Sequence, residues 1–332
     1  MSNLRSQNLA SNVAVTPAFS HTFSTHSAEL TPIALFVYNR PEHARRTVES
    51  LRANKLAQHS HLFVFADGAK NEFAATAVRE VRNLIRTIDG FRSVTVIERE
   101  RNLGLAGSVI NGVTQLSSTF GRAIVMEDDL LTTPDFLDFM NRALERYEAE
   151  TKILSVSGFN FAVSIPEEYP FDALCSYRSS SWGWGTWKDR WQTVDWDVSD
   201  YAAFQTDKSR RQLFDRGGQD LSCMLDLQMA GKIDSWAIRW AYDHFTKGGI
   251  ALLSTTAKVK NIGLDGSGVH SSPGCARQSE LVLERNSEYR FPHSVEIDPS
   301  IIAKIQRACR PSLRRRFAYY IRDKLRQNGL TP

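Results

Sequence analysis

Three consecutive carboxylates, Glu127, Asp128 and Asp129, directly follow the apolar run "AIVM". Like charges at neighbouring positions repel one another, and none can be buried without a cation or hydrogen-bond donors. A divalent cation would resolve the repulsion, and a hard cation held by one or two carboxylates binds phosphate oxygens well. The trio therefore predicts a divalent-cation site that would hold a nucleotide diphosphate. An acidic surface turn beside a helix N-terminus is the alternative.

The acidic trio ends the last of four short apolar runs, which cover residues 33–38, 61–67, 93–99 and 123–129. Helical periodicity fills the segments between them, and Thr133 and Pro134 are expected to open a further helix after the trio. Runs that are apolar on both faces, alternating with helices, predict an α/β fold with a mostly parallel sheet covered by helices.

Polar residues follow these runs where ligands bind open parallel sheets, at the carboxyl ends of the strands. Asn39 and Arg40 follow the first run, Asp67 the second, and Asn102 and Gly107 the third. An arginine fork can orient phosphate, and an aspartate can accept the N–H of a pyrimidine ring. A surface charge and an Asp-Gly turn are the alternatives for the first two positions, and a loop tip for the last two.

Beyond residue 150 the sequence becomes irregular and rich in tryptophan, with "SSSWGWGTWKDRW" at 179–191 and helical segments near 209–230 and 232–245. Indole rings offer flat apolar faces on which sugar C–H groups stack, so Trp184 and Trp187 are candidates for donor or acceptor contact. Burial in the core is the alternative for each ring.

Four stretches together resemble the GT-A class of nucleotide-sugar glycosyltransferases: "FVYNRPEHARRTVESL", "FADG", "RNLGLAGSVINGV" and "VMEDDLLTTPDFLDFM". The last is most similar to the acidic motif of the N-acetylglucosaminyltransferase I family, and the whole chain resembles bacterial sugar transferases of surface-polysaccharide pathways. The resemblance spans about residues 33–272. It implies a GT-A-like, Rossmann-like fold with an irregular, tryptophan-rich acceptor half.

The resemblance also implies roles for individual residues. Asp129 would coordinate the metal that bridges the diphosphate, while Asp128 and Glu127 would contact ribose and donor sugar. Arg40 and Asp67 match positions that contact the nucleotide base or its phosphates. Such enzymes often supply a late histidine to the metal or the phosphates, and His270 follows the glycine-rich stretch "NIGLDGSG", with Asp265 as the alternative polar group.

An inverting transfer needs a carboxylate that takes the proton of the acceptor hydroxyl. In "GKIDSWAIRW", Asp234 resembles the catalytic aspartate of the N-acetylglucosaminyltransferase I family. A helix N-cap at the same position is the alternative, and aspartate is common there. Asp220 and Asp226 are the other candidates for the base.

Composition limits the class of protein. The 332 residues are 42% hydrophobic, enough for a sizeable core, and the four cysteines are scattered without a CxxC pair, which favours reduced, buried thiols. Neither a membrane-spanning run nor a secretory signal is evident, so a cytoplasmic location is expected. Residues 304–326 hold nine Lys and Arg against one Asp, so this segment carries +8 and the remainder −4 of the net +4.

The basic segment has apolar residues at helical spacing. It predicts an amphipathic helix that could contact an anionic membrane surface from the cytoplasmic side, with a solvated surface helix as the alternative and nucleic acid not expected as a partner. The domain prediction is a flexible leader (1–30), a nucleotide-sugar-binding half (31–150), an acceptor half of the same domain (151–272) and a C-terminal extension (273–332).

The predicted function is metal-dependent, inverting transfer of a sugar from a nucleotide diphosphate sugar, most simply a UDP-sugar, to a glycan or lipid-linked glycan in lipopolysaccharide or capsule synthesis. Two alternatives stay open at this point. One is a sugar nucleotidyltransferase, although its glycine-rich, arginine-containing N-terminal loop is missing. The other is a non-catalytic glycan-binding protein with the same fold.

Overall fold

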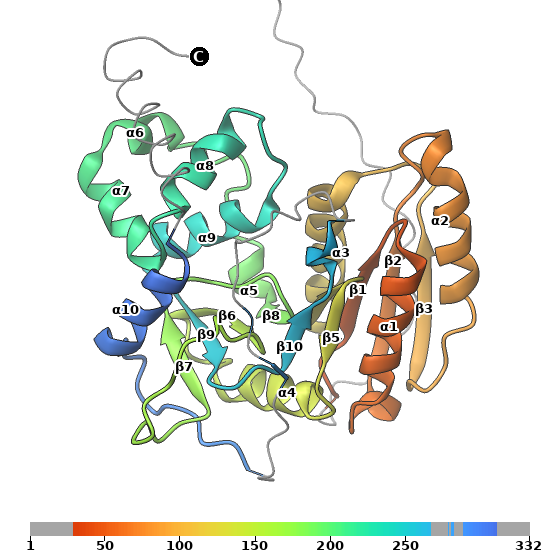
Figure 1. The fold of residues 1–332 in the computed structure, drawn as a ribbon, viewed down its shortest axis with the longest axis horizontal. Coiled ribbons are helices and arrows are strands. Elements are labelled where there is room, and N and C mark those ends of the chain that lie inside the picture. Colours follow the sequence, from red (N-terminus) through yellow and green to blue (C-terminus); the bar gives the residue numbers. More distant parts are fainter. Residues whose placement is uncertain (1–28, 267–277, 279, 282–287, 311–332) are drawn as a thin grey trace, which may run out of the picture.

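An eight-stranded sheet forms the centre of the protein in a computed structural model, which describes residues 29–266, 278, 280–281 and 288–310 (Figure 1). Its strand order is β3-β2-β1-β4-β8-β6-β9-β7. The strands are β1 (Ile33–Val37), β2 (His61–Ala66), β3 (Ser93–Glu98), β4 (Arg122–Glu127), β6 (Ile153–Ser157), β7 (Ala173–Ser176), β8 (Trp184–Trp187) and β9 (Ile250–Ser254).

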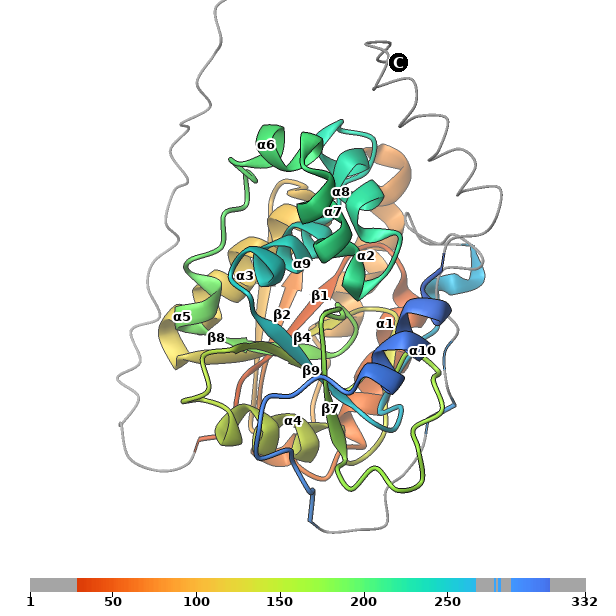
Figure 2. The same cartoon turned by 90° about the vertical axis from the view of Figure 1, so that its left-hand side faces the viewer.

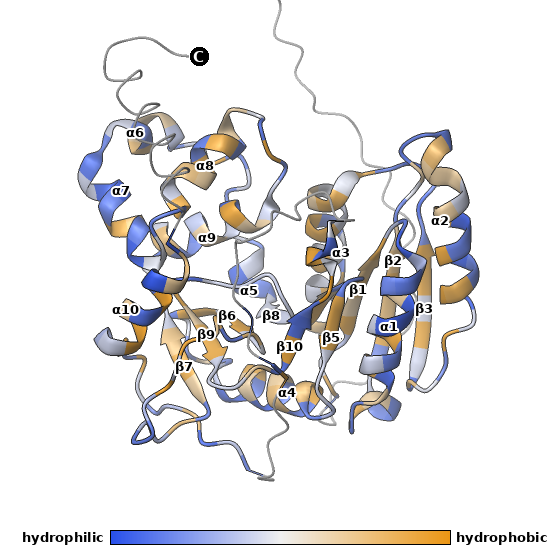
Figure 3. Cartoon of the chain, viewed as in Figure 1, coloured by the Kyte–Doolittle hydropathy of each residue, from blue (hydrophilic) through white to orange (hydrophobic). Residues whose placement is uncertain are grey.

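The four predicted apolar runs are β1 to β4, and they pair in parallel as expected. β1 and β2 are drawn largely in the hydrophobic colour (Figure 3). β3 differs from the expectation of two buried faces, because it lies at the edge of the sheet and all six of its residues are only half-buried. The predicted α/β class and mostly parallel sheet are confirmed.

Helices cover both faces of the sheet, and alternate residues of β1 show how. Ile33, Leu35 and Val37 pack with α1 (Pro41–Arg52), α2 (Glu72–Ile85) and α4 (Phe136–Arg146). Ala34 and Phe36 point to the other face and pack with α3 (Gly104–Phe120) and α9 (Trp236–Thr246). This alternation is the period of two that a strand imposes on its side chains.

Local signals at the helix starts agree closely with the structure. Pro41 occupies the first position of α1, where its missing N–H costs nothing. Asn71 caps α2 by accepting a hydrogen bond from the Ala74 N–H at 3.1 Å. The helix after the acidic trio begins at Phe136, two residues beyond the expected Pro134, because residues 130–132 form a short strand first.

The second half of the sheet mixes directions. β8 runs antiparallel to both β4 and β6, β6 and β9 are parallel, and β7 closes the far edge antiparallel to β9. The sheet therefore continues from the predicted nucleotide-binding half into the predicted acceptor half without a break. Next to it, β5 (Leu130–Thr132) pairs with β10 (Val259–Asn261) in a separate two-stranded sheet.

The helical segment expected near 209–230 is two helices, α7 (Lys208–Phe214) and α8 (Leu221–Met229), separated by the 3-10 turn η2 (Asp215–Gly217). Gly218 ends this turn with a φ of 152°, and a β-carbon there would collide with the Arg178 guanidinium. The remaining elements are η1 (Ala57–His59), α5 (Lys188–Trp191), α6 (Tyr201–Thr206), η3 (Gly263–Asp265) and α10 (Pro299–Ala308).

α10 packs through Ile301, Ile302 and Ile305 against the outer strands β7 and β9 (Figure 2). The apolar positions of the predicted basic helix, from Leu313 onward, lie outside the described residues. No helix among the described ranges has the length and apolar character needed to cross a bilayer. Cys175, Cys223 and Cys309 are buried, as expected, and Cys275 lies outside the described residues.

Candidate active site

The acidic trio lies at the carboxyl end of β4, beside the end of β1, where Glu127 is in register with Phe36. The Tyr38 N–H donates to Asp128 Oδ2 at 3.2 Å, and the Thr47 hydroxyl of α1 donates to the Asp128 carbonyl at 2.9 Å. β1 and α1 therefore fix the position of the trio. As predicted, the polar residues after β1, β2 and β4 share one edge of the sheet.

Arg40 supplies a positive charge to the trio. Its Nη2 lies 2.5 Å from Asp128 Oδ1 and 2.8 Å from Asp129 Oδ2, and only 19% of its side chain is exposed. Burial by itself would lower the pKa of Arg40, but the charges of Asp128 and Asp129 outweigh it and raise the pKa above its ordinary value. Arg40, at the same edge of the sheet, thus offsets the repulsion between the neighbouring carboxylates of the trio.

The donor set fits a divalent cation held largely by its ligand. The Oδ1 atom of Asp129 is buried without a hydrogen-bond partner among the described residues, so one hard oxygen is available. No group of three or more His, Cys, Asp or Glu side chains in the described part of the chain forms a ready cage. A cation at this edge would thus take one or two carboxylate oxygens and complete its shell with phosphate and water, as Mg2+ commonly does.

Glu127 differs from its two neighbours because Arg40 forms no ion pair with it. Burial, followed by the like charges of Asp129 and Asp128, raises the pKa of Glu127 to about 8. Burial also raises the pKa of Asp128, although the Arg40 charge opposes the shift. A raised pKa favours the protonated form of Glu127, in which the carboxyl can donate a hydrogen bond as well as accept one.

A segment from the far end of the chain covers Asp129. The Ile262 N–H donates to the Asp129 carbonyl at 2.8 Å, at the point where β10 ends. A β-carbon on Gly263 would collide with the Asp129 carboxylate and would lie 2.7 Å from Arg40 Nη1. Asp265 extends the contact, with its Oδ2 3.2 Å from Nε2 of His43 on α1. No local pattern indicates this contact, because 134 positions separate residues 129 and 263.

Asp67 organises the loop that starts α3. Its two oxygens accept from the N–H groups of Leu103 at 2.9 Å and Gly104 at 3.0 Å, and from the Asn102 side chain at 3.1 Å. The two backbone N–H groups lie at a helix N-terminus and have no partner within the helix, so a carboxylate that accepts from them is stabilising. Gly68 is needed beside them, since a β-carbon there would lie 2.5 Å from the Arg101 carbonyl carbon. The predicted contact between Asp67 and a nucleotide base stays a prediction.

Asp234 reaches the same edge from the other half of the molecule. Its Oδ2 would lie 3.6 Å from a β-carbon built on Gly104, whose N–H is bound by Asp67. The expected alternative, an N-cap at Asp234, is wrong: Ser235 caps α9 by accepting from the Ile238 N–H at 3.3 Å. Asp234 is exposed and forms no hydrogen bond or ion pair with another described residue. Its carboxylate is thus available for chemistry.

The two other candidates for the base have structural partners. Asp220 forms a two-pronged ion pair with Arg178 at 2.7 and 2.9 Å. Asp226 is 1% exposed, pairs with Arg211 at 3.0 Å through both oxygens and accepts from the Tyr201 hydroxyl at 3.0 Å. A carboxylate held in this way is poorly placed to take a proton from a substrate, which leaves Asp234 as the best candidate.

Several predicted ligand contacts are not borne out by the positions of the side chains. Trp184 and Trp187 are 0% and 2% exposed: Trp184 stacks on Trp236 at 5.1 Å within the core, and the Trp187 N–H donates to the Leu144 carbonyl. They cannot stack on a sugar, because core side chains already cover their rings. For Gly107 the alternative of a loop tip is wrong, because the residue lies within the first turns of α3, and its contact with the donor stays a prediction.

The contacts predicted for Asn39 and His270 stay predictions. Asn39 is half-buried between the end of β1 and Arg40, and its contact with the donor stays a prediction. His270 lies outside the described residues, and so does the rest of the glycine-rich stretch after Gly266.

Residues 33–166 match the family model described as Glycosyl transferase family 2. This match runs from β1 through the acidic trio to the loop after β6, and the sheet edge it contains is the one that carries Arg40, Asp67 and Asp129. The glycosyltransferase class and the GT-A fold predicted from the sequence agree with this match, which covers 134 of the 332 residues. The resemblance of the chain to the N-acetylglucosaminyltransferase I family in particular stays a prediction.

Two solved structures that the chain resembles share little sequence identity with it. The Staphylococcus aureus TarS fragment 1–349 is 8% identical with a TM-score of 0.37, and the alignment covers 69% of this chain and 60% of that one. The mannosyltransferase PcManGT of Pyrobaculum calidifontis, solved with GDP-Man and Mn2+, is 10% identical with a TM-score of 0.35, covering 71% of this chain and 74% of that one. No curated protein matches the chain significantly.

Proposed function

We propose that this glycosyltransferase moves a sugar from a nucleotide diphosphate sugar, most simply a UDP-sugar, to a hydroxyl of a glycan or lipid-linked glycan acceptor, with inversion. The observation that carries the proposal is the convergence of two acidic groups at one sheet edge. The trio at 127–129 lies at the end of β4, and Asp234, from the other half, lies against the first turn of α3.

The two groups suit the two ends of the reaction. Asp234 would accept the proton of the acceptor hydroxyl while the oxygen of that hydroxyl forms a bond to the anomeric carbon of the donor sugar. The bond between that carbon and the diphosphate breaks, and its electron pair leaves with the diphosphate. An attack from the face opposite the leaving group inverts the anomeric configuration.

The acidic trio and the Arg40 side chain paired with it would hold the nucleotide-sugar donor. Asp129 would hold a Mn2+ or Mg2+ ion, which when bound supplies positive charge to the leaving diphosphate. Arg40 can turn from Asp128 and Asp129 toward a phosphate, because a guanidinium binds either oxyanion through the same fork. Glu127 and Asp128 lie beside this point and would contact ribose and donor sugar.

Replacing Asp234 by asparagine tests the assignment of the base. D234N keeps the shape of the side chain but cannot take a proton at neutral pH, so transfer should fall about 10²–10⁴-fold. Binding of UDP with Mn2+, followed by calorimetry, should stay within about twofold, because the acidic trio is unchanged. Donor identity is found beforehand by screening nucleotide diphosphates with and without Mn2+ for a thermal shift.

Asp197 provides the matched control for this experiment. It is also exposed. Burial lowers the pKa of Arg239, and the charges of Asp234 and Asp197 both oppose this shift. D197N therefore changes the field at Arg239 in the same sense without touching the proposed base, and it should retain transfer. Transfer that survives in D234N, or falls equally in D197N, contradicts the role given to Asp234.

The location of the enzyme in the cell determines which acceptors it can reach. We infer that the basic segment 304–326 contacts anionic lipid on the cytoplasmic face of a membrane and brings the enzyme to a lipid-linked acceptor used in surface-polysaccharide synthesis. The support is the +8 charge of this segment and its helical apolar spacing.

A further inference from the structure

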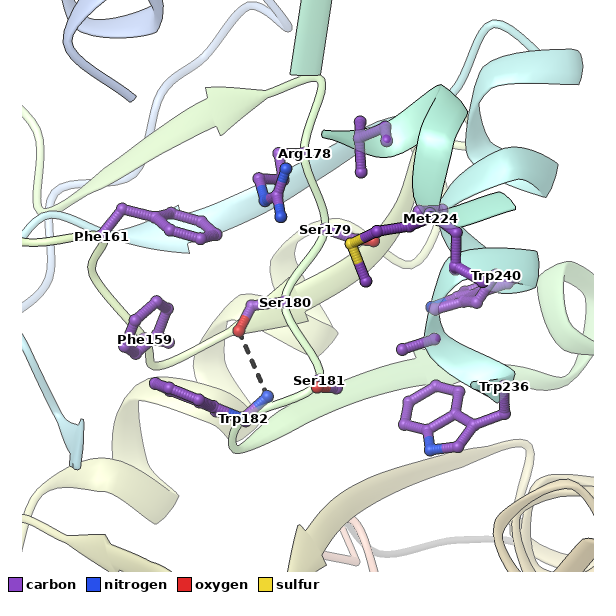
Figure 4. Close-up of a pocket in the computed structure, with 14 residues that line it drawn as sticks. Phe159, Phe161, Arg178, Ser179, Ser180, Ser181, Trp182, Met224, Trp236 and Trp240 are labelled. Atoms are coloured by element: carbon purple, nitrogen blue, oxygen red, sulfur yellow. Dashed lines mark hydrogen bonds between the residues drawn. The ribbon is translucent and has the colours of Figure 1, made fainter. Parts of the chain in front are cut away.

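A pocket of about 210 Å³ opens beside the proposed base, between α8, α9 and the loop that joins β7 to β8 (Figure 4). No residue assigned to the donor, the metal or the base lines it. Five aromatic residues from three separate parts of the chain contribute to its wall. Phe161, 9% exposed, and the half-buried Trp182 offer accessible ring surface, whereas Phe159, Trp236 and Trp240 are only 1–2% exposed.

The polar groups of the pocket are neutral and have hydrogen-bonding capacity to spare. Residues 179–181 are three consecutive serines along one side. Ser180 accepts from the Trp182 N–H at 3.2 Å, and its own O–H still has a free donor, while the Ser179 and Ser181 hydroxyls bind no other described residue.

Arg178 is the one charged residue among the described residues that line the pocket, and its charge is already used. Asp220 binds it through two hydrogen bonds at 2.7 and 2.9 Å, and the guanidinium lies 5.7 Å from the centre of the Phe161 ring. A carboxylate or phosphate in the pocket would have to displace Asp220. The pocket is therefore electrically neutral toward a ligand.

We propose that this pocket binds one neutral pyranose ring of the acceptor glycan; the inference rests on the proposed transfer function and names the acceptor class. A pyranose has an apolar C–H face, which can stack on the rings of Phe161 and Trp182, and a rim of hydroxyls, which can pair with the three serine hydroxyls. The volume is below the 300–1,000 Å³ or so of pockets for larger ligands, so it suits a single ring rather than an extended chain.

The position of the pocket agrees with an acceptor site. Trp236 begins α9 and forms part of the wall, and Asp234 precedes it by two residues, so one short turn presents both the wall and the proposed base. Asp234 in turn reaches the N-terminus of α3 on the donor side. A ring held in the pocket would therefore lie on the acceptor side of the base, next to the donor edge.

Saturation-transfer NMR on the full chain tests the inference directly. The probes are the methyl glycosides of glucose, galactose, mannose and N-acetylglucosamine, each neutral hexoside of the first three compared with its uronic acid counterpart. At least one neutral glycoside should receive saturation at its ring C–H protons, and its uronide should bind at least fivefold more weakly. Absence of binding by all the neutral glycosides, or equal binding of the uronides, overturns the inference without any variant.

Two methionines of α8 give a matched pair of variants. Met224 lines the pocket and Met229 does not, although both are half-buried and pack against the same apolar cluster. M224F should narrow the pocket and weaken glycoside binding at least tenfold, while M229F should bind as the wild type does. Equal binding in wild type, M224F and M229F overturns the pocket assignment; if M224F fails to fold, the comparison of neutral and acidic glycosides still decides.

Failure of this inference can be told apart from failure of the proposed function. D234N should keep glycoside binding and lose transfer, since it leaves the aromatic wall intact. Transfer that proceeds normally in M224F refutes the pocket alone. Glycoside binding without transfer from any nucleotide sugar refutes the proposed transfer function and leaves a glycan-binding site.

Discussion

Arg40 and Asp234 show how the partners of a charged side chain decide what it can do. Arg40 is held by two carboxylates of the acidic trio, so it offsets their negative charge. Asp234 has no such partner among the described residues and lies exposed at the same edge. The first residue is a structural cation until a ligand competes for it, whereas the second is available as a base from the outset.

Removing the Arg40 charge should destabilise the protein in a way that a divalent cation reverses. In R40Q, Asp128 and Asp129 repel each other without compensation, and breaking a largely buried pair on one side costs about 3 kcal/mol. Mn2+ without nucleotide should raise the midpoint of thermal unfolding more in R40Q than in wild type, because Arg40 no longer occupies the carboxylates. Differential scanning calorimetry measures both effects.

Arg45 on the same helix is the control for R40Q. It pairs with Glu42 and Glu49, but these contacts are exposed, so R45Q should change stability little and should leave the response to Mn2+ as in wild type. Identical Mn2+ responses in R40Q and wild type would mean that Arg40 and a metal ion do not share these oxygens.

At the scale of elements, the donor edge depends on a segment far away in sequence. β10 pairs with β5 immediately after the acidic trio, and this pairing brings Gly263 onto Asp129. α9 has the same kind of role on the opposite side, because its N-terminus places Asp234 while its interior is anchored by buried polar contacts of His244.

Adding one methyl group at residue 263 should disturb the donor edge. G263A places a β-carbon against Asp129 and Arg40, so β10 must move away, and UDP binding with Mn2+ should weaken at least tenfold in calorimetry. G248A is a control for the addition itself, since its β-carbon would meet nothing within 4 Å; the positive φ of 61° at this residue makes alanine less favourable by about 1–2 kcal/mol, which should lower stability but leave UDP binding unchanged. Unchanged binding in G263A would show that this contact is not needed.

His244 should make the protein less stable in mild acid. It is fully buried, shares a hydrogen bond with Ser155 Oγ at 2.9 Å and one with the Trp240 carbonyl at 2.8 Å, and burial lowers its pKa to about 4. The unfolded chain has a His pKa near 6.5, so between pH 6.5 and 4 it binds more protons than the folded chain. The free energy of unfolding should therefore fall by about 2 kcal/mol between pH 7 and pH 5.

Urea unfolding at these two pH values measures this loss. H244Q keeps polar groups at the site but cannot take up a proton, so its stability should depend less on pH over this range. H59Q removes an exposed histidine and should retain the pH dependence of the wild type. The role of His244 is contradicted if H244Q loses as much stability as wild type in acid.

At the scale of the whole molecule, the charge of the chain is unevenly divided. Residues 304–326 carry +8 while the remainder carries −4. α10 ends at Ala308 and buries Ile305 in the core, so the described part of the basic segment belongs to the folded domain. A truncation that tests membrane contact must therefore begin after Arg310, not at residue 304.

Deleting residues 311–332 should weaken binding to anionic vesicles while leaving the domain folded. The deleted stretch contains six Lys and Arg against one Asp, and each basic residue near an anionic surface contributes about 1 kcal/mol. Co-sedimentation with phosphatidylserine-containing vesicles should be lost in the truncated chain, and raising the salt should weaken it in the full chain. Equal sedimentation of both chains, with circular dichroism unchanged, rules out this contact.

The sequence by itself determined the first four strands and their parallel direction. It also determined the helices between them and the edge at which Arg40, Asp67 and the acidic trio meet. It could do so because each signal is local: an apolar run, a helical period, a cap such as Asn71, and the rule that parallel strands end at one edge. The choice of Asp234 also came from its sequence context, and the structure corrected only the capping role.

Tertiary structure alone decided which positive charge faces the trio, which carboxylates are free, and where the tryptophans lie. Arg40 and Asp129 meet across two strands, Asp220 and Asp226 are paired by arginines from other elements, and Trp184 is enclosed by rings from α5 and α9. The contact of Gly263 with Asp129 belongs to the same group. The physical reason is that burial and ion pairing depend on residues that are distant in sequence, so no local pattern can encode them.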